Sequence, residues 1–125
     1  MKVLVTGAGG YIASYLLPYL RSKKIDVYAI TSKKLPHASC HAVNWRQVSE
    51  LESLLKSVRP DYIYHLAGTR NLSPFSDFTA VNVQYASNLF DAMLNSRVLV
   101  PILIVGSAAE YGNVPLNEMP IREET

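Results

Sequence analysis

The chain has 125 residues, the size of one domain, and 49% of them are hydrophobic, which is enough for a packed core. Its 12 basic and 10 acidic residues nearly balance, which argues against a nucleic-acid or membrane surface. One cysteine excludes an internal disulfide and favours a reducing compartment, and no apolar run is long enough to span a bilayer. Because Met1 and Lys2 lead directly into a strand, no signal peptide is expected, and we predict a cytoplasmic protein.

Strands are expected to alternate with helices along the chain. Apolar runs predict five strands, at Lys2–Thr6, Asp26–Ile30, Ala42–Trp45, Tyr62–Ala67 and Pro101–Val105. Helical spacing predicts three helices, at Tyr11–Ser22, at Arg46–Val58 and from Asp77 or Thr79 to Leu94. The alternation predicts parallel βαβ units with right-handed crossovers, and therefore a doubly wound α/β sheet.

Two of these elements carry more specific expectations. The first helix is expected to bend at Pro18 and to bury a stripe made of Ile12, Tyr15, Leu16, Tyr19 and Leu20. The fifth strand is nearly all apolar, which is typical of a strand buried on both faces.

A glycine-rich turn follows the first predicted strand. Residues 3–13 read VLVTGAGGYIA, which is an apolar strand, a glycine turn and the start of an apolar helix. Gly7 permits the tight turn, Gly10 lets the backbone approach a phosphate, and Ala13 allows close packing of helix on strand. Free N–H groups at the start of a helix point at a bound anion. We therefore predict a dinucleotide pyrophosphate site made by Gly7, Gly10, Tyr11, Ile12 and Ala13.

The second predicted strand ends in a basic segment, Thr31-Ser32-Lys33-Lys34. Ligands of a parallel sheet lie beyond the carboxyl ends of its strands, where an NAD site often has an acidic residue for the adenosine ribose. This segment has none, and two hydroxyls followed by two lysines suit a 2′-phosphate. We therefore favour NADP over NAD, with Thr31, Ser32 and Lys33 as contacts. The alternative is a solvated basic loop.

The ends of the third and fourth predicted strands carry further candidate contacts. Asn44 and Trp45 stand where adenine contacts are usual; alternatively, Asn44 caps the next helix and Trp45 packs in the core. The small residues of Leu66-Ala67-Gly68 would let a cofactor lie across the sheet edge. His65, inside the strand, is interpreted as a hydrogen-bonded core residue.

Two further groups of residues are candidates for a metal site and for a catalytic residue. His37, Cys40 and His41 form a cluster, but three ligands in one loop do not complete a tetrahedral site, so no metal is predicted. Ser107 follows the fifth strand, where its hydroxyl would reach a substrate beside the nicotinamide. The alternative for Ser107 is a hydroxyl that only caps a turn.

Four stretches of the chain resemble the extended short-chain dehydrogenase/reductase family, the nucleotide-sugar epimerases, dehydratases and reductases. They are VTGAGGYIA (5–13), RPDYIYHLAG (59–68), Asn82-Val83 leading to Asn88-Leu89, and VGSAAEYG (105–112), with Pro120-Ile121-x-Glu123 resembling the segment that often follows. The resemblance covers essentially the whole chain. It implies a Rossmann-type sheet, truncated here after about the fifth strand, that binds NADP or NAD with Asn82 among its contacts. Residues 1–125 would then be the N-terminal part of the NAD(P)-binding domain, without the family's substrate domain.

The resemblance also implies a catalytic role for Ser107. In that family a Tyr-x-x-x-Lys pair moves the proton of a sugar hydroxyl or ketone while the nicotinamide exchanges hydride. A Ser or Thr four residues before a Tyr-Gly pair hydrogen-bonds the same substrate oxygen, and here Tyr111-Gly112 is that pair. The Tyr-x-x-x-Lys pair is expected beyond Thr125, and the same spacing at Tyr19 and Lys23 is taken as coincidence. We therefore expect no turnover from these 125 residues alone.

One further position separates reactions within the family. Its sugar 4,6-dehydratases use a Glu two residues before the Tyr-Gly tyrosine, often beside an Asp. Those positions are Ala109 and Ala108 here, and Glu110 stands one residue too late. The sequence therefore favours an epimerase or a 4-keto-sugar reductase acting on a nucleotide sugar. The alternative is a non-catalytic NAD(P)-binding regulator or redox sensor.

Association with a second copy is also allowed by the sequence. In the resembling family, the helix that ends here at Leu94 commonly packs against a partner subunit, which allows a homodimer. The apolar fifth strand would also lie at an open sheet edge, and such edges pair or aggregate.

Overall fold

The computed structural model describes residues 1–31 and 33–123, with only the backbone described at Ala108 and Ala109. Five parallel strands form one sheet in the order β3-β2-β1-β4-β5. The strands are β1 (Lys2–Thr6), β2 (Asp26–Ile30), β3 (Ser39–His41), β4 (Tyr62–His65) and β5 (Ile102–Ile104). The strand order reverses direction next to β1, so the predicted doubly wound, Rossmann-type fold is confirmed.

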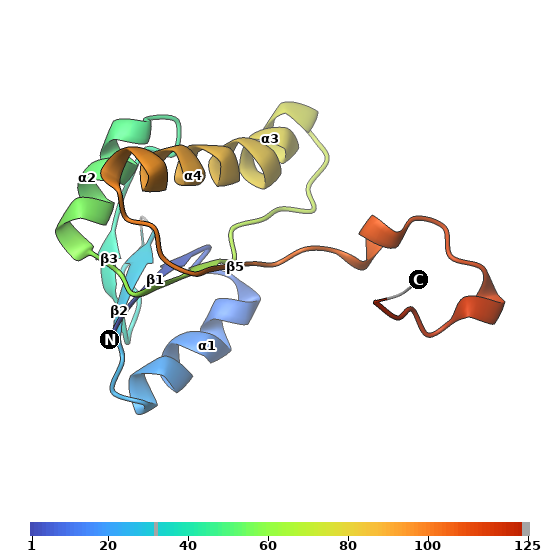
Figure 1. Cartoon of the computed structure of the whole chain (residues 1–125), viewed down its shortest axis with the longest axis horizontal. Helices are drawn as coiled ribbons and strands as arrows, with labels where there is room; N and C mark the ends of the chain where they lie inside the picture. Colours follow the sequence, from blue (N-terminus) through green and yellow to red (C-terminus); the bar gives the residue numbers. More distant parts are fainter. Residues whose placement is uncertain (32, 124–125) are drawn as a thin grey trace.

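Helices cover both faces of the sheet (Figure 1). α1 (Tyr11–Ser22) lies on one face, and α2 (Val48–Val58) and α4 (Tyr85–Ser96) lie together on the other. α3 (Phe75–Thr79) and a π-helical turn, η1 (Ala80–Gln84), lead directly into α4. Right-handed crossovers in opposite directions from β1 place the helices on opposite faces.

The central strand β1 divides the core into two clusters, because its side chains alternate between the faces. Val3 and Val5 pack on the α1 side with Leu17 and Leu20. Leu4 packs on the other side, in a cluster with Ile30, Leu51, Leu55, Ile63 and Leu89. Every position of β1 from Val3 to Thr6 is buried, as expected for a strand covered on both faces.

The buried face of α1 differs from the predicted stripe. Ala13, Leu17 and Leu20 are buried, whereas Tyr11, Ile12, Tyr15 and Tyr19 are exposed. The helix carries two apolar stripes, one aliphatic and one rich in tyrosine. The aliphatic stripe packs on the sheet because the small Ala13 allows a close approach, and the tyrosine hydroxyls stay in water.

Several boundaries also differ from the sequence expectations. β4 ends at His65 rather than Ala67, β5 spans Ile102–Ile104 rather than Pro101–Val105, and α4 ends at Ser96 rather than Leu94. β3 is Ser39–His41 rather than Ala42–Trp45, because its register pairs Tyr28 with Ser39 and Ile30 with His41, where β2 ends. α2 begins at Val48, after a turn closed by the Asn44 side chain. The helical segment that includes α4 begins at Phe75, directly after Pro74, which stands at its N-cap.

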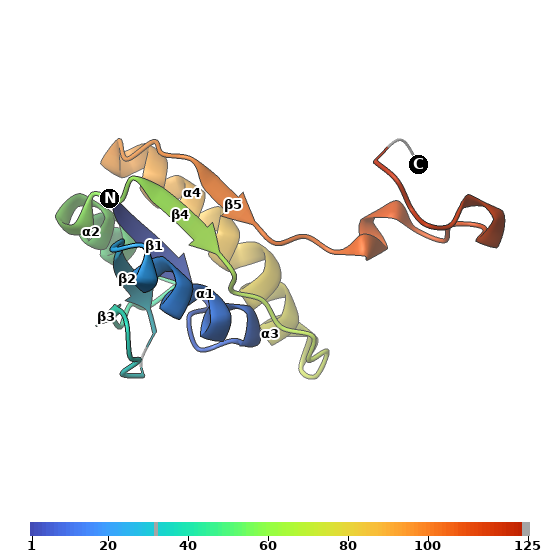
Figure 2. The same ribbon diagram turned by 90° about the horizontal axis from the view of Figure 1, so that it is seen from below.

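β5 is an edge strand and is not buried on both faces, so that expectation was wrong. Leu103 and Ile104 point to opposite faces of the sheet, and they are 41% and 44% exposed. The expected open edge is confirmed by the strand order of the described residues. Beyond β5 the chain leaves the sheet and carries two 3₁₀ turns, η2 (Ala108–Tyr111) and η3 (Leu116–Glu118) (Figure 2).

Among residues 1–31 and 33–123, no helix combines the length and the apolar character that a membrane crossing needs.

Candidate functional site

Gly7 forms the turn between β1 and α1 and has no room for a side chain. Its φ is +64°, and a Cβ there would lie 2.5 Å from the carbonyl carbon of Leu66 and from the nitrogen of Ala67. Positive φ and close approach of backbone both require glycine. Gly7 therefore lets the end of β4 come against the turn that follows β1.

Gly10 is the N-cap of α1 and leaves the start of the helix open. Its N–H donates to the Gly7 carbonyl at 2.9 Å, and a Cβ on Gly10 would lie 3.1 Å from that oxygen. The first turn of α1 has no acidic residue and no side-chain cap. The N–H groups of Tyr11, Ile12 and Ala13 lack acceptors within the helix and, with the helix dipole, suit an anion.

A buried hydrogen-bond relay joins β1 to the end of β4. Thr6 Oγ1 lies 2.8 Å from His65 Nδ1 and accepts the N–H of Ala67 at 3.2 Å. The hydroxyl of Thr6 and Nδ1 of His65 share one hydrogen, and the tautomer of the imidazole sets which of the two donates it. The relay holds the backbone of Ala67 against the glycine turn.

His65 is a satisfied core histidine, as predicted. Its side chain is buried, and the Trp45 indole meets it edge-on with ring centroids 6.0 Å apart. Burial lowers the pKa of His65 below its ordinary value because the charged imidazolium is desolvated. His65 is therefore neutral at pH 7 and serves as a fixed hydrogen-bond partner for Thr6.

Asn82 fastens the loop after β4 to the helical layer. Its Oδ1 accepts the N–H of Thr69 at 2.9 Å, and its Nδ2 donates to the Thr69 carbonyl at 2.8 Å. A Cβ on Gly68 would lie 3.3 Å from the same Oδ1. Asn82 belongs to the π-helical turn η1, and such turns are frequent at functional sites. It thus fixes the backbone beside two predicted contacts, Ala67 and Gly68.

The end of β2 presents the predicted basic segment at the same edge of the sheet. The N–H of Thr31 donates to the His41 carbonyl at 2.9 Å. The hydroxyl of Thr31 accepts the N–H of Lys33 at 3.1 Å. Lys33 and Lys34 are exposed. The predicted contact Ser32 lies outside the described residues.

Asn44 and Trp45 follow β3 in a loop rather than ending a strand. Asn44 Oδ1 accepts the N–H of Arg46 at 3.1 Å, so the side chain closes a turn, and the N-cap of α2 is Gln47. The idea that Asn44 caps the helix is therefore wrong. Trp45 packs on the core and stacks on Tyr85 with centroids 5.1 Å apart, as the core alternative predicts.

Ser107 follows β5 at the carboxyl edge of the sheet. The preceding Val105 donates its N–H to the His65 carbonyl at 3.5 Å, which links this segment to the end of β4. Ser107 is exposed, and its own N–H donates to Glu110 Oε1 at 2.7 Å. Sequence reasoning considered Glu110 only as a misplaced base and missed this contact, although the spacing Ser-x-x-Glu is the signal for it.

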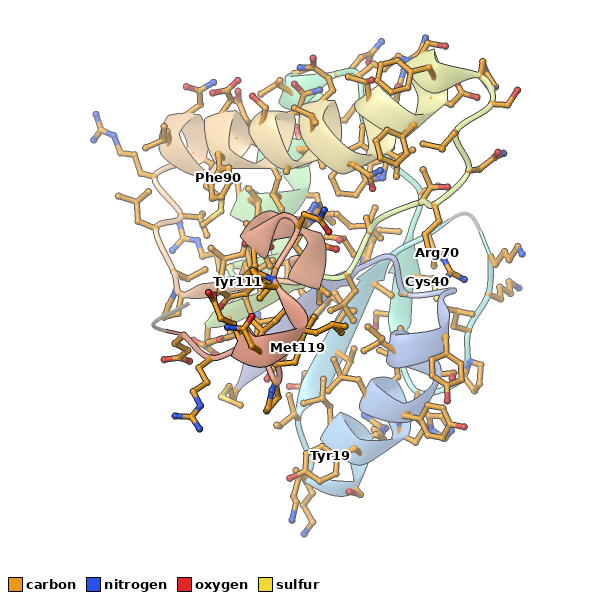
Figure 3. All side chains as sticks on the ribbon, turned by 90° about the vertical axis from the view of Figure 1, so that its right-hand side faces the viewer. Tyr19, Cys40, Arg70, Phe90, Tyr111 and Met119 are labelled. Atoms are coloured by element: carbon orange, nitrogen blue, oxygen red, sulfur yellow. The ribbon has the colours of Figure 1, made fainter. Side chains whose placement is uncertain are left out.

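The Tyr-x-x-x-Lys spacing at Tyr19 and Lys23 lies away from this edge. Lys23 Nζ sits 5.5 Å from the ring centroid of Tyr19. Both residues stand at the C-terminal end of α1, whereas the glycine turn is at its N-terminal end (Figure 3). This placement agrees with the interpretation of the spacing as coincidence.

The other chemistry-bearing groups of the described chain lie elsewhere. Among residues 1–31 and 33–123, no three His, Cys, Asp or Glu side chains are grouped as a metal site. Cys40 Sγ accepts the N–H of Leu35 at 3.3 Å, and His41 stacks on Tyr28. A surface pocket of about 620 Å³ lies between the loop after β3 and the helical layer, lined by Arg46, Ser76, Thr79, Ala80, Gln84 and Asn88.

Comparison with known proteins connects this geometry to a family. GDP-L-colitose synthase of Yersinia pseudotuberculosis is 28% identical over 116 residues, which are 89% of this chain and 35% of that protein. UDP-2-acetamido-2,6-beta-L-arabino-hexul-4-ose reductase of Pseudomonas aeruginosa is 30% identical over 115 residues, which are 90% of this chain and 27% of that protein. The chain thus spans about a third of the length of these curated relatives.

A solved structure shows the same fold. UDP-glucose 4-epimerase from Bifidobacterium longum, in complex with NAD+ and UDP, superposes with a TM-score of 0.83 at 23% identity, over 99% of this chain and 42% of that one. The model of the NAD dependent epimerase/dehydratase family matches residues 3–125. With its glycine turn, parallel sheet and ordered loops, this chain belongs to the NAD dependent epimerase/dehydratase family.

Proposed function

We propose that residues 1–125 form the NAD(P)-binding part of a nucleotide-sugar epimerase or 4-keto-sugar reductase. One observation carries the proposal. Gly7 and Gly10 open the N-terminus of α1 at the carboxyl edge of a parallel sheet, and no acidic side chain occupies the first turn. That arrangement is complementary to a pyrophosphate.

The remaining cofactor contacts follow from the loops at this edge. Tyr11 and Ile12 are exposed where a pyrophosphate would lie, and Ala13 is buried against the sheet. The backbone of Ala67 and Gly68, held by Thr6 and Asn82, would support the middle of the dinucleotide. Asn44 keeps its Nδ2 group for an adenine edge, since only its Oδ1 is used in the turn. Trp45 and Leu66 are proposed as contacts because they follow β3 and β4 at the same edge of the sheet.

Charge at the end of β2 supports NADP over NAD. No acidic residue occurs between Asp26 and Glu50, so no carboxylate there would bind ribose hydroxyls or repel a phosphate. Lys33 and Lys34 are exposed in this interval, and the Thr31 hydroxyl orders the backbone of Lys33. Exposed lysines beside hydroxyl groups suit a 2′-phosphate.

The substrate side of the proposal concerns Ser107. When bound, NADP or NAD would supply hydride exchange at its nicotinamide ring. Ser107 would donate a hydrogen bond to the sugar oxygen at the reacting carbon. By their names, the two curated relatives are a sugar-nucleotide synthase and a sugar-nucleotide reductase, which supports a nucleotide sugar as substrate.

The test uses a charge placed where the pyrophosphate would lie. Ile12→Glu puts a carboxylate on an exposed position in the first turn of α1. A negative charge at this end of a helix interacts favourably with the helix dipole, so the variant should stay folded. We expect the variant to weaken NADPH binding about tenfold in a fluorescence titration. Tyr15→Glu is the matched control, because it adds the same charge to the same helix one turn further on, and it should leave the affinity within about twofold. No binding of NADPH or NADH by the unmodified chain would overturn the proposal.

A further inference from the structure

We infer that Glu110 is a positioning residue, whose carboxylate fixes the backbone of Ser107; the inference rests on the role proposed above for Ser107. Two hydrogen bonds join Ser107 and Glu110. The N–H of Ser107 donates to Glu110 Oε1 at 2.7 Å, and the N–H of Glu110 donates to the Ser107 carbonyl at 3.0 Å. This is the reach-back half of a capping box, with Ser107 directly before η2 and Glu110 inside it.

Gly106 provides a second observation of the same contact. A Cβ built on Gly106 would collide with Glu110 Oε1, so the carboxylate occupies the space of a side chain at position 106. Glu110 Oε1 thus lies against the backbone of both Gly106 and Ser107. Gly112, one residue after η2, has a φ of +71° with open space around it, so this glycine is needed for its backbone angle. The segment from Gly106 to Gly112 is thus one self-contained turn.

Ser107 lies where the sheet no longer holds the backbone, so the hydrogen bond to Glu110 is needed to fix it. Ser107 lies beyond the last paired residue of the sheet, in the segment that leaves the body of the molecule (Figure 2). Sheet hydrogen bonds therefore do not fix its backbone. A charged acceptor makes a stronger hydrogen bond to an N–H group than a neutral one, and here the charge is three residues away in the chain. Glu110 consequently acts through Ser107, and its carboxylate is engaged there rather than free to remove a substrate proton.

The test is the amide signal of Ser107 in the ¹⁵N-labelled chain, compared among the unmodified chain, Glu110→Gln and Glu110→Ala. A hydrogen bond to a carboxylate shifts an amide proton downfield. In the unmodified chain the Ser107 signal should move upfield as acid protonates the carboxylate. In Glu110→Gln it should show no such pH response and should lie between the neutral-pH positions of the unmodified chain and of Glu110→Ala, because a neutral amide oxygen still accepts but more weakly. In Glu110→Ala it should lie upfield at every pH.

Controls separate positioning from general structure. Glu118→Ala removes an exposed glutamate from the other 3₁₀ turn and should leave the Ser107 signal unchanged. Sheet amides such as that of Ile63 report whether each variant is folded. If Glu110→Ala is unfolded, the pH response of the unmodified chain against Glu110→Gln still decides. An identical pH response in those two proteins, or an unchanged signal in a folded Glu110→Ala, overturns the inference.

Addition of NADPH distinguishes this inference from the proposed function. NADPH should shift the amides of Gly10 and Ile12 in all three proteins, and that of Ser107 in the unmodified chain and Glu110→Gln but not in Glu110→Ala. Unmoved glycine-turn amides would refute cofactor binding while the pH response of Ser107 still reports on Glu110. A Ser107 response to NADPH that survives in Glu110→Ala counts against positioning.

Discussion

Gly7 and Gly9 stand in the same turn and differ in what a side chain would meet there. A Cβ on Gly7 collides with the backbone of Leu66 and Ala67, whereas nothing lies within 4 Å of a Cβ on Gly9. Only Gly7 has a positive φ. Glycine is therefore sterically required at position 7 and is not required at position 9.

Gly7→Ala should be strongly destabilising. The left-handed conformation alone costs about 1–2 kcal/mol for a residue with a Cβ. Displacement of the end of β4 adds to this, so we expect a loss of about 3 kcal/mol in the free energy of unfolding measured with urea. Gly9→Ala is the control and should be neutral or stabilising by up to about 1 kcal/mol. Equal stability of the two variants would contradict the geometry described for Gly7.

His65 should make stability depend on pH. Its pKa in the folded chain is lowered below 6.5 by burial, so in the range between that lowered value and about 6.5 the unfolded chain binds more protons. The stabilisation is complete above about pH 6.5 and is lost as the pH falls, by up to about 1.4 kcal/mol per pH unit. Urea unfolding at pH 7.5 and 5.5 measures the loss.

His65→Asn tests the assignment, because an amide oxygen can accept from Thr6 without titrating in this range. The variant should lose less stability between pH 7.5 and 5.5 than the unmodified chain. His37→Asn, at an exposed position, should behave like the unmodified chain. The same pH dependence in His65→Asn as in the unmodified chain would exclude His65 as its source.

The loop after β2 carries the residues proposed to favour NADP over NAD. Lys33→Ala removes an exposed charge from the place proposed for a 2′-phosphate. Loss of one such contact is worth about 1 kcal/mol, so NADPH affinity should fall about fivefold at low salt while NADH affinity stays unchanged. The difference should shrink at high ionic strength.

Lys56→Ala is the matched control for the charge change, since Lys56 lies on α2 and pairs with Glu52 at 3.7 Å. It should leave both affinities unaltered. Equal losses of NADPH and NADH affinity in Lys33→Ala would argue for a general electrostatic effect instead of recognition of the 2′-phosphate.

Element types were predictable from the sequence where a local signal and the packing agree. β1, β2 and α1 have the expected bounds, because apolar runs and the glycine turn mark them in the chain itself. β3 was misplaced, because its extent depends on where β2 ends. The outward tyrosines of α1 were assigned inward, because spacing alone does not say which of two apolar stripes packs on the sheet.

The candidate site was predictable to the level of loops, and its internal contacts were not. Gly7 and Ala67 were both singled out by strand-end reasoning, yet their contact depends on the pairing of β1 with β4, which are distant in the chain. The Thr6 relay and the Thr69 partner of Asn82 depend on the same long-range pairing or on the π-helical turn. The Glu110 contact is local and could have been found from its capping-box spacing.

At the scale of the whole molecule, the open edge at β5 should govern association. The outward edge of β5 has no strand partner among the described residues, and Leu103 and Ile104 beside it are partly exposed. Such an edge pairs with other chains. We expect concentration-dependent self-association in sedimentation velocity, and Leu103→Lys should reduce it, because a charge blocks edge pairing.

Leu116→Lys makes the same change at a residue that is 90% exposed in η3, away from the sheet. It should leave association as it is in the unmodified chain. If both lysine variants reduce association equally, general apolar exposure is the cause, and if the unmodified chain is monomeric at all concentrations, the edge is not adhesive.

The position of β1 in the middle of the sheet has a consequence for the order of folding. β1 comes before both of its partners in the chain: the Met1 carbonyl accepts the N–H of Asp26, and the N–H of Lys2 donates to Asp61 Oδ2. The second contact forms only after the chain has been synthesised as far as β4. The entropic cost of closing the loop between β1 and β4 grows with the length of chain between them. A nascent chain that ends before β4 therefore holds β1 paired on one side only. The glycine turn gains its final shape only when Leu66 and Ala67 lie beside it, so the proposed cofactor site is complete only after the fourth strand has been translated.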